Sequence, residues 1–322
     1  MKLVLLATTI AFYFLLQTAA GSVSVVTYNM GQLSSWGFDF VACTEDRREP
    51  QLRAIFDAKS SPIFKSKKFV LFIQEAWTHR IFQDLLVISD ILSLYMYPKK
   101  FEFLRNNGQI TITNIKPLEI SYHPYSIDKH SNKGMLYMKL DLGNGKTLGA
   151  LNVHTGYSNA YKASDLHLVH LQEINHFLDK FRDKSTHFVL GGDFNAGPDM
   201  VFRDQQYDSA KVIWEDGLMP HIRRHKLKHI QGLAKKTWDG NNPLVTDPPF
   251  AIALSYFFWN LTLNWDQVDS TLDHIFVSEE VTVKESSVVF DRPAKISCYG
   301  REDKNGLLPL SDHYGVNAVL EI

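Results

Sequence analysis

The sequence predicts an α/β protein in which two β-sheets pack together with helices on the outside. Many short apolar or alternating runs are bounded by turn residues, as is typical of strands. Only one long stretch shows clear helical periodicity. The chain has 322 residues, of which 45% are hydrophobic, and no repeat or Pro/Ser-rich linker divides it. A single large domain with a sizeable core is therefore expected.

The N-terminal residues are typical of a secretory signal peptide. Lys2 is followed by an apolar stretch, Leu3–Leu16, and then by small residues that end at Gly21. The alternative is a single membrane anchor, but the apolar stretch is shorter than the roughly 20 residues that cross a bilayer. We therefore expect a signal peptide at residues 1–20, a secreted, extracellular protein, and a single mature domain at residues 21–322.

Strands are expected where apolar or alternating runs end in polar residues. In order, these runs are "SVSVVTYN" (22–29), "FVLFIQEAW" (69–77), "GMLYMKLDL" (134–142), "TLGALNVH" (147–154), "HFVLGGDFN" (187–195), "TLDHIFVS" (271–278) and "HYGVNAVLEI" (313–322). The turn Gly143-Asn144-Gly145 predicts a hairpin between the third and fourth runs. Residues 164–182 predict a helix, because their apolar side chains fall mostly on one helical face.

Residues that are costly to bury without partners stand at the ends of these strands. They are Asn29, Glu75, His154, Asp193 with Asn195, and Asp312 with His313, while Asp273 lies inside the strand 271–278. For any one of them, a turn cap is sufficient explanation. The repetition of acids, amides and histidines at successive strand ends instead indicates one shared polar site.

The residue types indicate the chemistry of this site. Carboxylate and amide oxygens suit a hard divalent ion such as Mg²⁺, whereas structural zinc sites use cysteines and clustered histidines. Asp193 and Asn195 are two residues apart on an extended chain, so both point to the same face and can approach one phosphate. His313, next to Asp312, suits a general base near neutral pH, and Asp273 can hold its imidazole in the right tautomer.

The overall charge argues mildly against nucleic acid as the partner. The formal net charge is -1, from 34 basic and 35 acidic residues, whereas proteins that bind nucleic-acid phosphates usually have a basic excess. One local basic cluster, "HIRRHKLKH" at 221–229, is suited to attract anionic lipid or nucleic acid. Its alternative interpretation is a solvated charged face.

Several motifs, taken together, resemble a known family. "TYNM", "IQEAW", "NVH", "GGDFNAGPD", "TLDHIFVS" and "LSDHYGV" follow the order seen in the endonuclease/exonuclease/phosphatase superfamily. That superfamily includes DNase I-like nucleases, inositol phosphatases and neutral sphingomyelinases. The resemblance covers nearly all of the mature chain, and it implies a DNase I-like four-layer α/β sandwich that cleaves a phosphoester with water and Mg²⁺.

The resemblance implies a metal site built from three of the residues. Glu75 would be the principal metal ligand, Asn29 would lie beside the metal, and Asp312 would lie near the metal or the phosphate. Mg²⁺ is the expected ion, with Mn²⁺ or Ca²⁺ as alternatives. Whether one ion or two are used is left open.

The resemblance also implies catalytic roles for the other five residues. His154 would stabilise charge on the phosphate in the transition state, and His313 would be the general base with Asp273 as its orienting partner. Asp193 would orient or activate the attacking water, and Asn195 would hold a phosphate oxygen.

Two further segments are similar to the sphingomyelinase branch. "HSNKGMLYMKL" (130–140) resembles a Lys-Gly strand motif of that branch, which makes Lys133 a substrate-binding candidate. "KTWDGNNPL" (236–244) resembles a Thr-Trp-Asp segment with Asn241 or Asn242 near the substrate, and its alternative is a plain turn. The chain departs from bacterial sphingomyelinases between "LDHIF" and "SDH", because this interval lacks their strongly apolar hairpin.

Two features each have two interpretations. Cys43 and Cys298 are the only cysteines, and they are free to pair in an oxidising compartment, but the sequence does not place them close together. The aromatic stretch 248–265 is too short to span a bilayer. It is either an interfacial loop that enters lipid or a buried strand or helix.

These features predict a secreted, Mg²⁺-dependent sphingomyelin phosphodiesterase that releases ceramide and phosphocholine at a phospholipid membrane surface. No obligate protein partner is evident from the sequence. One alternative is a secreted DNase I-like endonuclease acting on nucleic acid. Another is a binding protein that keeps the fold without the chemistry, which the intact set of acids and His313 argues against.

Overall fold

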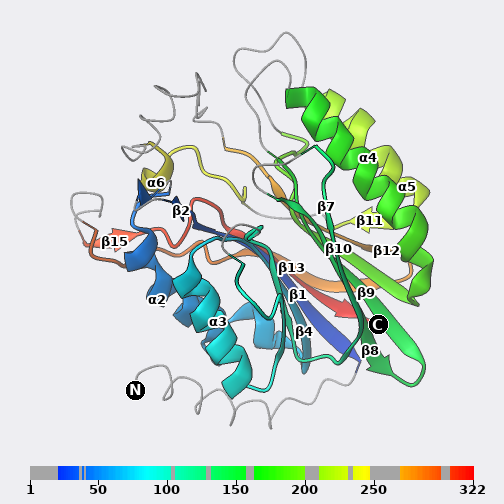
Figure 1. The fold of residues 1–322 in the computed structure, drawn as a ribbon, viewed down its shortest axis with the longest axis horizontal. Coiled ribbons are helices and arrows are strands. Elements are labelled where there is room, and N and C mark those ends of the chain that lie inside the picture. The colour runs from blue at the N-terminus through cyan, green and yellow to red at the C-terminus, as the bar shows by residue number, and fades with distance from the viewer. Residues whose placement is uncertain are drawn as a thin grey trace.

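The computed structural model describes residues 21–35, 38–39, 41–102, 106–127, 132–156, 163–199, 210–230, 235–246, 269–298 and 305–322. The predicted signal peptide (1–20) and the aromatic stretch (248–265) lie outside the described residues. Figure 1 shows strands in the middle of the molecule, with α2 and α3 on one side and α4 and α5 on the other. This arrangement confirms the predicted four-layer α/β sandwich.

The first sheet has the strand order β13-β16-β1-β4-β6-β5. Its strands are β13 (Thr282–Val289), β16 (Gly315–Glu321), β1 (Ser22–Gln32), β4 (Lys68–Ala76), β6 (Ile110–Thr113) and β5 (Tyr95–Tyr97). The central strands β1 and β4 run parallel, and β16 and β6 flank them antiparallel. Buried on both faces, β1 and β4 contain the long apolar runs expected of central strands.

The second sheet has the strand order β11-β12-β10-β9-β8-β7. Its strands are β11 (Leu227–His229), β12 (Asp273–Ser278), β10 (His187–Asp193), β9 (Lys146–His154), β8 (Gly134–Gly143) and β7 (Pro117–Pro124). Here β9 and β10 are the parallel pair, and β8 and β9 form the hairpin predicted from the Gly-Asn-Gly turn. Two small sheets also occur, β2 (Ser34–Ser35) with β3 (Phe38–Asp39) and β14 (Ala294–Lys295) with β15 (Leu307–Leu308).

The helices cover the outer faces of the sheets. They are α2 (Thr44–Phe56), α3 (His79–Ile91), α4 (Ala163–Phe181), α5 (Met219–Arg224), α6 (Pro243–Thr246), two short 3-10 helices (Pro62–Lys65 and Arg182–Lys184) and a π-helix (Ala210–Leu218). The predicted helix 164–182 is α4. Helix α3, which the sequence did not predict, starts where the Thr78 hydroxyl accepts a hydrogen bond from the Ile81 N–H.

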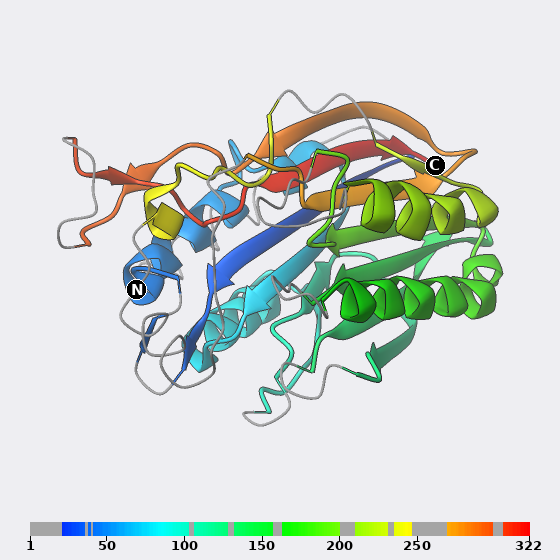
Figure 2. The same cartoon turned by 90° about the horizontal axis from the view of Figure 1, so that it is seen from above.

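The inner faces of the two sheets meet in an apolar layer. Val25, Val70 and Phe72 of the first sheet pack there with Ala150 and Val189 of the second. Separate apolar clusters join each outer face to its helices. Figure 2 shows β13, in orange, along one side of this sandwich and the turquoise strands on the opposite side. Because this layer fixes which residues of each strand point inward, it also fixes the face to which the polar residues at the strand ends point.

Two sequence expectations are resolved by the fold. Cys43 and Cys298 form a disulfide, with 5.9 Å between their Cα atoms. Asp273 is the first residue of β12 and does not lie inside it. The strand starts there because the backbone N–H groups of Leu272 and Asp273 both donate to the Thr237 hydroxyl, at 2.9 and 3.1 Å.

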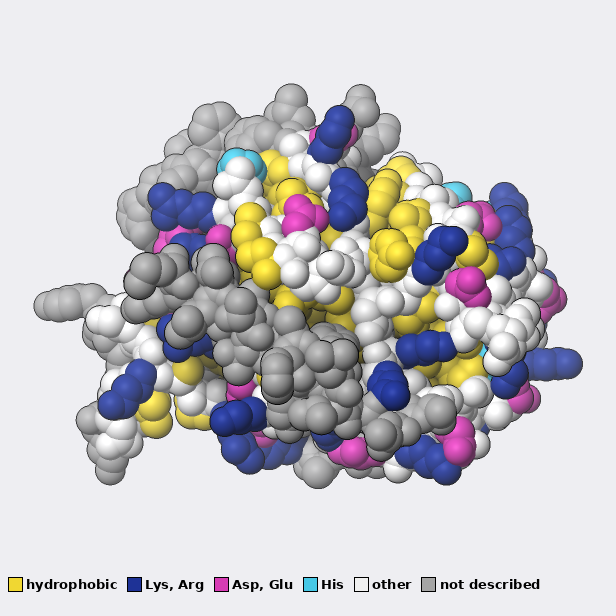
Figure 3. Space-filling model, turned by 90° about the horizontal axis from the view of Figure 1, so that it is seen from below, with side chains coloured by type: hydrophobic (Ala, Val, Ile, Leu, Met, Phe, Trp, Pro, Cys, Tyr) yellow, Lys and Arg dark blue, Asp and Glu magenta, His cyan; other side chains and the backbone are white. Residues whose placement is uncertain are grey.

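The described surface is mixed in character. Figure 3 shows one face, on which apolar side chains are exposed between lysines and arginines. Among the described residues, the exposed large apolar side chains belong to α3, to the strands β5 and β7, and to nearby turns. No helix in the described ranges is long and apolar enough to span a membrane.

Candidate active site

The polar strand ends of the two sheets meet at one edge of the sandwich. The side-chain amide of Asn29, in β1, donates a hydrogen bond of 2.9 Å to Asp193 Oδ2, at the end of β10. This bond joins the carboxyl ends of the parallel strands of both sheets. The structure thus brings eight of the predicted site residues together at one edge of the sandwich. They are Asn29, Glu75, Asp312 and His313 from the first sheet and His154, Asp193, Asn195 and Asp273 from the second.

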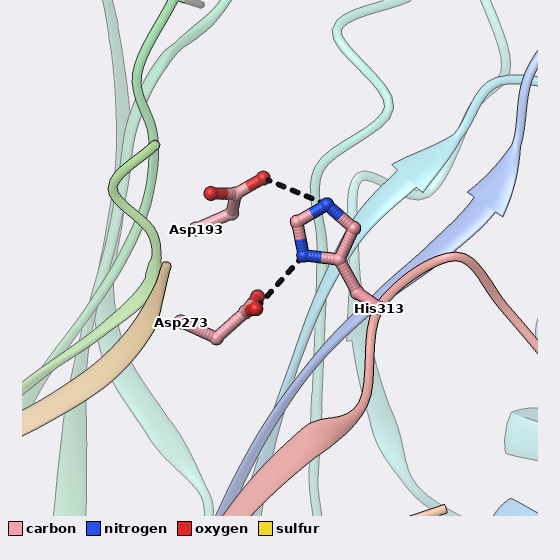
Figure 4. A group of neighbouring side chains, drawn as sticks. All are labelled: Asp193, Asp273 and His313. Atoms are coloured by element: carbon pink, nitrogen blue, oxygen red, sulfur yellow. Dashed lines mark hydrogen bonds and ion pairs between the residues drawn. The ribbon is translucent and has the colours of Figure 1, made fainter. Parts of the chain in front are cut away.

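His313 lies between two carboxylates (Figure 4). Its Nδ1 is 2.8 Å from Asp273 Oδ2, and its Nε2 is 3.9 Å from Asp193 Oδ2. The indole of Trp238 packs edge-on against the imidazole, with 4.9 Å between ring centroids. The short hydrogen bond to Asp273 fixes the imidazole orientation and leaves Nε2 facing the site.

The charges around His313 control its proton. Burial by itself lowers the pKa of His313, but the Asp273 and Asp193 carboxylates outweigh this effect and raise it to about 10. Burial raises the pKa of Asp273 to about 6, and the His313 charge opposes that rise. At neutral pH the pair is therefore a carboxylate and an imidazolium. A cation beside the neighbouring carboxylates would cancel part of their field and lower the pKa of His313.

Asp193 and Asn195 lie on a tight turn after β10. Asp193 Oδ1 accepts a 2.8 Å hydrogen bond from the Asn195 backbone N–H. Asn195 adopts a left-handed backbone conformation with φ 46°, which asparagine tolerates better than most residues. Its side-chain amide donates to the Thr155 carbonyl at 3.0 Å. The side-chain nitrogen of Asn195 therefore holds this turn next to His154.

Glu75 has an unusual backbone and an unusual proton affinity. Its φ is 55°, a left-handed conformation that is costly for a non-glycine residue and is typical of functional sites. Burial, and then repulsion from Asp312, raise the pKa of Glu75 to about 7, while Lys133 and His313 oppose the rise. The fold thus holds two carboxylates close together at the end of the first sheet.

Asp312 is held against the backbone of β1. The Ser311 hydroxyl lies 3.0 Å from Asp312 Oδ1 and 2.9 Å from the Asn29 carbonyl, and its single hydrogen is donated to one of these oxygens or shared between them. Gly31, with φ 53°, lets the end of β1 approach the segment that carries Asp312, because a Cβ atom on Gly31 would lie 2.3 Å from Asp312 Oδ1. A glycine is therefore required beside this carboxylate.

His154 is buried without a hydrogen bond. Among the described residues, neither ring nitrogen has a hydrogen-bond partner. Nε2 lies 3.7 Å from Glu75 Oε1 and 3.7 Å from Asp193 Oδ2. Burial, with the positive charges of Lys133 and His313, lowers the pKa of His154 well below its usual value, so the ring is neutral. A buried polar group of this kind is costly unless something in the site binds it.

The three predicted substrate-binding residues lie in different surroundings. Lys133 Nζ donates to the Thr155 carbonyl at 3.2 Å and is close enough to Glu75 to lower its pKa. Asn242 is buried, and its amide donates to the Ser311 carbonyl at 2.8 Å. Asn241 is exposed on the neighbouring turn. The structure thus brings Lys133 to the site, while Asn242 supports the chain that precedes His313.

The donor set fits a divalent cation. The tightest group among the described residues is Asp193, Asp273 and His313, whose ligand atoms lie within 4.8 Å of one another. In that group, however, His313 Nδ1 and Asp273 are already bound to each other. Glu75 and Asp312 repel each other across the site and so gain most from a cation. Carboxylates at Glu75, Asp312 and Asp193 are hard oxygen ligands of the kind that Mg²⁺ takes.

Sequence reasoning missed several residues that support the site. Arg47 of α2 is fully buried and donates to the carbonyls of Met30, Gly31 and Leu310 at 3.2, 2.6 and 2.9 Å. Met30 and Gly31 follow Asn29 in β1, and Leu310 precedes Asp312 in the segment that leads to β16. Nothing in the local sequence pattern of α2 marks Arg47. Thr237 and Trp238, by contrast, belong to the "KTWDGNNPL" segment singled out from the sequence.

The basic cluster 221–229 lies away from the site. It forms α5 and β11, and Leu227 of β11 pairs with Ser278, at the opposite end of β12 from Asp273. Arg224 is ion-paired with Asp179 at 2.8 Å. The cluster therefore does not line the edge that carries the candidate catalytic residues.

Comparisons with solved structures show the same fold across nearly the whole chain. Beta toxin from Staphylococcus aureus is 18% identical, with a TM-score of 0.57, and the match covers 92% of this chain and 98% of the toxin. Sphingomyelinase C from Streptomyces griseocarneus is 17% identical, with a TM-score of 0.60, covering 92% and 99%. Truncated TDP2 from Caenorhabditis elegans is 14% identical, with a TM-score of 0.56, covering 94% and 98%.

A search of curated protein sequences finds no significant match. The sequence model of the endonuclease/exonuclease/phosphatase family, however, matches residues 26–313, which span the site from β1 to His313. Two mixed sheets with flanking helices, and the convergence of the family's motifs at one edge, agree with that match. The chain therefore belongs to the endonuclease/exonuclease/phosphatase family.

Proposed function

We propose that this protein is a secreted, Mg²⁺-dependent phosphodiesterase that hydrolyses sphingomyelin to ceramide and phosphocholine. The observation that carries the hydrolase proposal is the hydrogen bond of 2.8 Å between Asp273 and His313, set opposite the acidic group around Glu75. An oriented imidazole and a cation site at one edge of the sandwich suit attack of water on a phosphodiester.

Each half of the site contributes a different part of the proposed reaction. With the cation site filled, the pKa of His313 would fall and leave the imidazole neutral, so that His313 Nε2 would take the proton of the attacking water while Asp273 stabilises the imidazolium that forms. Asp193, between His313 and His154, would orient that water. His154, neutral and without a hydrogen bond, would donate one to a phosphoryl oxygen.

Glu75, Asp312 and Asn29 would hold the cation. When bound, a divalent ion there supplies Lewis-acid polarisation of the phosphoryl group and offsets the charge of the carboxylates. Lys133, beside Glu75, adds a second positive charge for the phosphate. A Staphylococcus aureus beta toxin variant with a similar fold, at 17% identity and a TM-score of 0.58, was solved with bound magnesium ions.

The position of the basic cluster favours a lipid over nucleic acid. The basic cluster 221–229 lies at the end of β12 away from Asp273, so it does not offer its charges to a DNA backbone in the site. The fold is similar to that of a sphingomyelinase C, although TDP2 is similar to a comparable degree. Secretion is supported by the N-terminal apolar segment and by the Cys43–Cys298 disulfide, since disulfides persist in oxidising compartments.

A paired assay tests this proposal. Purified mature protein is offered sphingomyelin vesicles and, separately, supercoiled plasmid DNA, each with Mg²⁺ or with a chelator. We expect phosphocholine release that needs Mg²⁺, no nicking of the plasmid, and loss of release in His313→Ala. The Lys226→Ala variant, at an exposed position in the basic cluster, is the matched control and should keep full activity. Nicked DNA with intact sphingomyelin would instead establish a nuclease.

A further inference from the structure

β5 and β7 form one side of the sandwich. They are the last strands in their sheets, so no further strand of the described residues pairs beyond them. Tyr97 of β5 is in register with Thr111, whose hydroxyl is 3.5 Å from the Asn152 amide of the opposite sheet. Tyr122 of β7 is in register with Leu136, and Leu136 with Asn152. Because side chains in register share a face, both tyrosines point inward between the sheets.

A pocket of about 410 Å³ opens on this side. Its apolar wall comprises Tyr97, Pro98, Tyr122, Pro124 and Leu136. The volume lies within the range of roughly 300–1,000 Å³ that is usual for small-molecule sites. The wall thus offers two aromatic rings and three apolar side chains to one ligand.

The polar groups at the back of the pocket are mostly committed to the fold. Asn106 donates to the Trp77 carbonyl at 3.0 Å and accepts from the Gly108 N–H at 3.1 Å. Gln109 donates to the Gly134 carbonyl at 3.1 Å and accepts from the N–H of the same residue. These amides shape the pocket but have little hydrogen-bonding capacity left for a ligand. Lys100, Glu102 and Asn107 also line the pocket, so it is the wall formed by Tyr97, Tyr122 and Leu136, and not the whole pocket, that suits an apolar occupant.

The pocket adjoins the candidate active site. Gly108, next to Gln109, accepts a 2.9 Å hydrogen bond from the backbone N–H of Ala76, the residue after Glu75. Asn132, in the pocket wall, precedes Lys133, which lies beside Glu75. The pocket and the candidate active site are therefore built on neighbouring residues at the same edge of the sandwich.

Apolar side chains continue outward from the pocket. Tyr95 lies on the same face of β5 as Tyr97 and is 40% exposed, and Ile120 lies on the same face of β7 as Tyr122 and is 38% exposed. Ile120 is in register with Met138, which belongs to the apolar layer between the sheets. Tyr95, Tyr97, Ile120, Tyr122 and Leu136 together are called the edge groove below.

We propose that the edge groove binds an aliphatic chain of the substrate, with the phosphodiester held at Glu75 and His313. This inference rests on the proposed lipid phosphodiesterase function and deepens it, because it assigns the residues that select a chain-bearing substrate. A linear chain matches the run of apolar side chains from Leu136 outward to Tyr95 and Ile120. A phosphodiester without an apolar chain leaves the edge groove empty.

The test separates chain binding from catalysis. Alkylphosphocholines with chains of two to ten carbons, kept below their micelle concentrations, compete against hydrolysis of bis(p-nitrophenyl) phosphate by the Mg²⁺-loaded protein. We expect the inhibition constant to fall about two-fold per added methylene, since a fully buried methylene is worth about four-fold. In Ile120→Asn and Tyr95→Ser the fall per methylene should be clearly smaller. Turnover of the chainless substrate should stay unchanged.

Val87→Asn is the matched control, because Val87 is an apolar side chain of α3 that is 48% exposed and is not part of the edge groove. It should show the wild-type dependence on chain length. The edge groove is overturned if the inhibition constant depends on chain length equally in the wild type and in both groove variants. It is also overturned if the wild type shows no such dependence, and in either case sphingomyelin hydrolysis can still stand. Plasmid nicking without sphingomyelin hydrolysis overturns the proposed function and the edge groove together.

Discussion

The two halves of the site are held in place in different ways. In the second sheet, hydrogen bonds within the half itself fix the geometry, from Asp193 through Asn195 to Thr155. In the first sheet, Glu75 and Asp312 face each other as like charges, and bracing comes from outside the strands, through the buried guanidinium of Arg47. The turn after β10 in the second half is therefore held by its own hydrogen bonds, although His154 beside it has none among the described residues, whereas the first half keeps an unbalanced charge.

This difference indicates a division of labour. The half without charge balance is the one that gains most from a cation, because a divalent ion removes the repulsion between Glu75 and Asp312. The half that is already hydrogen-bonded orients water and phosphate without rearranging, as preorganised sites do. His313 joins the two, since it lies just before β16 of the first sheet and binds Asp273 of the second.

The largest effect is expected when the link between the halves is broken at Asp273. In Asp273→Asn the amide no longer stabilises the imidazolium of His313, so kcat should fall on the order of 10³-fold, within the range of general-base losses. The pKa of His313 should also fall, because the Asp273 carboxylate raises it. Steady-state kinetics and NMR titration of the imidazole measure these changes. Mg²⁺ affinity should change little, and a large loss of Mg²⁺ binding would contradict the division.

The opposite outcome is expected for Glu75→Gln in the first half. The amide keeps the shape of the side chain but removes its charge, so Mg²⁺ affinity should fall on the order of 10²-fold. In the wild type, protons compete with the cation below about pH 7, since burial and Asp312 raise the pKa of Glu75 to about 7. Calorimetric titration with Mg²⁺ at pH 6 and pH 8 measures both effects. Unchanged affinity in the variant would place the cation elsewhere.

The bracing of the first half is tested at Arg47. Arg47→Met leaves the Gly31 carbonyl without its side-chain donor and leaves the carbonyls of Met30 and Leu310 with Gln51 alone, so the free energy of unfolding should fall by about 3 kcal/mol. Urea unfolding measures this loss. Arg53→Met, in the same helix, is the control, because Arg53 is exposed and its ion pair with Glu49 lies at the surface, so that its loss should cost less than about 1 kcal/mol. Equal losses in both variants would remove the special role of Arg47.

The sequence predicts the second half better than the first. In "GGDFN" the acid, the amide and the end of the strand are consecutive, so local periodicity places Asp193 and Asn195 correctly at the sheet edge. The helix 164–182 is likewise readable, because its apolar stripe is continuous. The disulfide joins residues that are 255 positions apart, and the Asn29–Asp193 hydrogen bond joins residues that are 164 positions apart. A local sequence pattern cannot predict contacts between residues so far apart in the chain.

The parts that the sequence does not predict depend on tertiary contacts. Arg47 is polar and lies in a helix with Pro50 and a weak apolar stripe, so its burial follows only from the carbonyls that it meets. Asn195 looks like a phosphate ligand in the sequence, yet its amide nitrogen binds the Thr155 carbonyl in the fold. His167 stands on the helix 164–182 without any signal, although it reaches the turn after β10.

The smallest effect is expected at His167, which supports the hydrogen-bonded half. Its Nε2–H donates to the Phe194 carbonyl at 2.7 Å, between Asp193 and Asn195. Burial lowers the pKa of His167 to about 4, against a usual value of 6.5. The unfolded chain therefore takes up a proton at a pH where the folded protein does not. The stability that neutral His167 contributes is fully present above pH 6.5 and is lost as the pH falls through 4.

Between pH 7 and pH 5 this one group should lower the free energy of unfolding by about 2 kcal/mol. His167→Gln keeps a side-chain donor for the Phe194 carbonyl but does not titrate, so its urea-unfolding free energy should depend less on pH by that amount. His176→Gln, at an exposed position of the same helix, should keep the wild-type dependence. If both variants keep the wild-type pH dependence, the acid sensitivity originates outside the turn after β10. The second-sheet half of the site is then not held by a neutral His167.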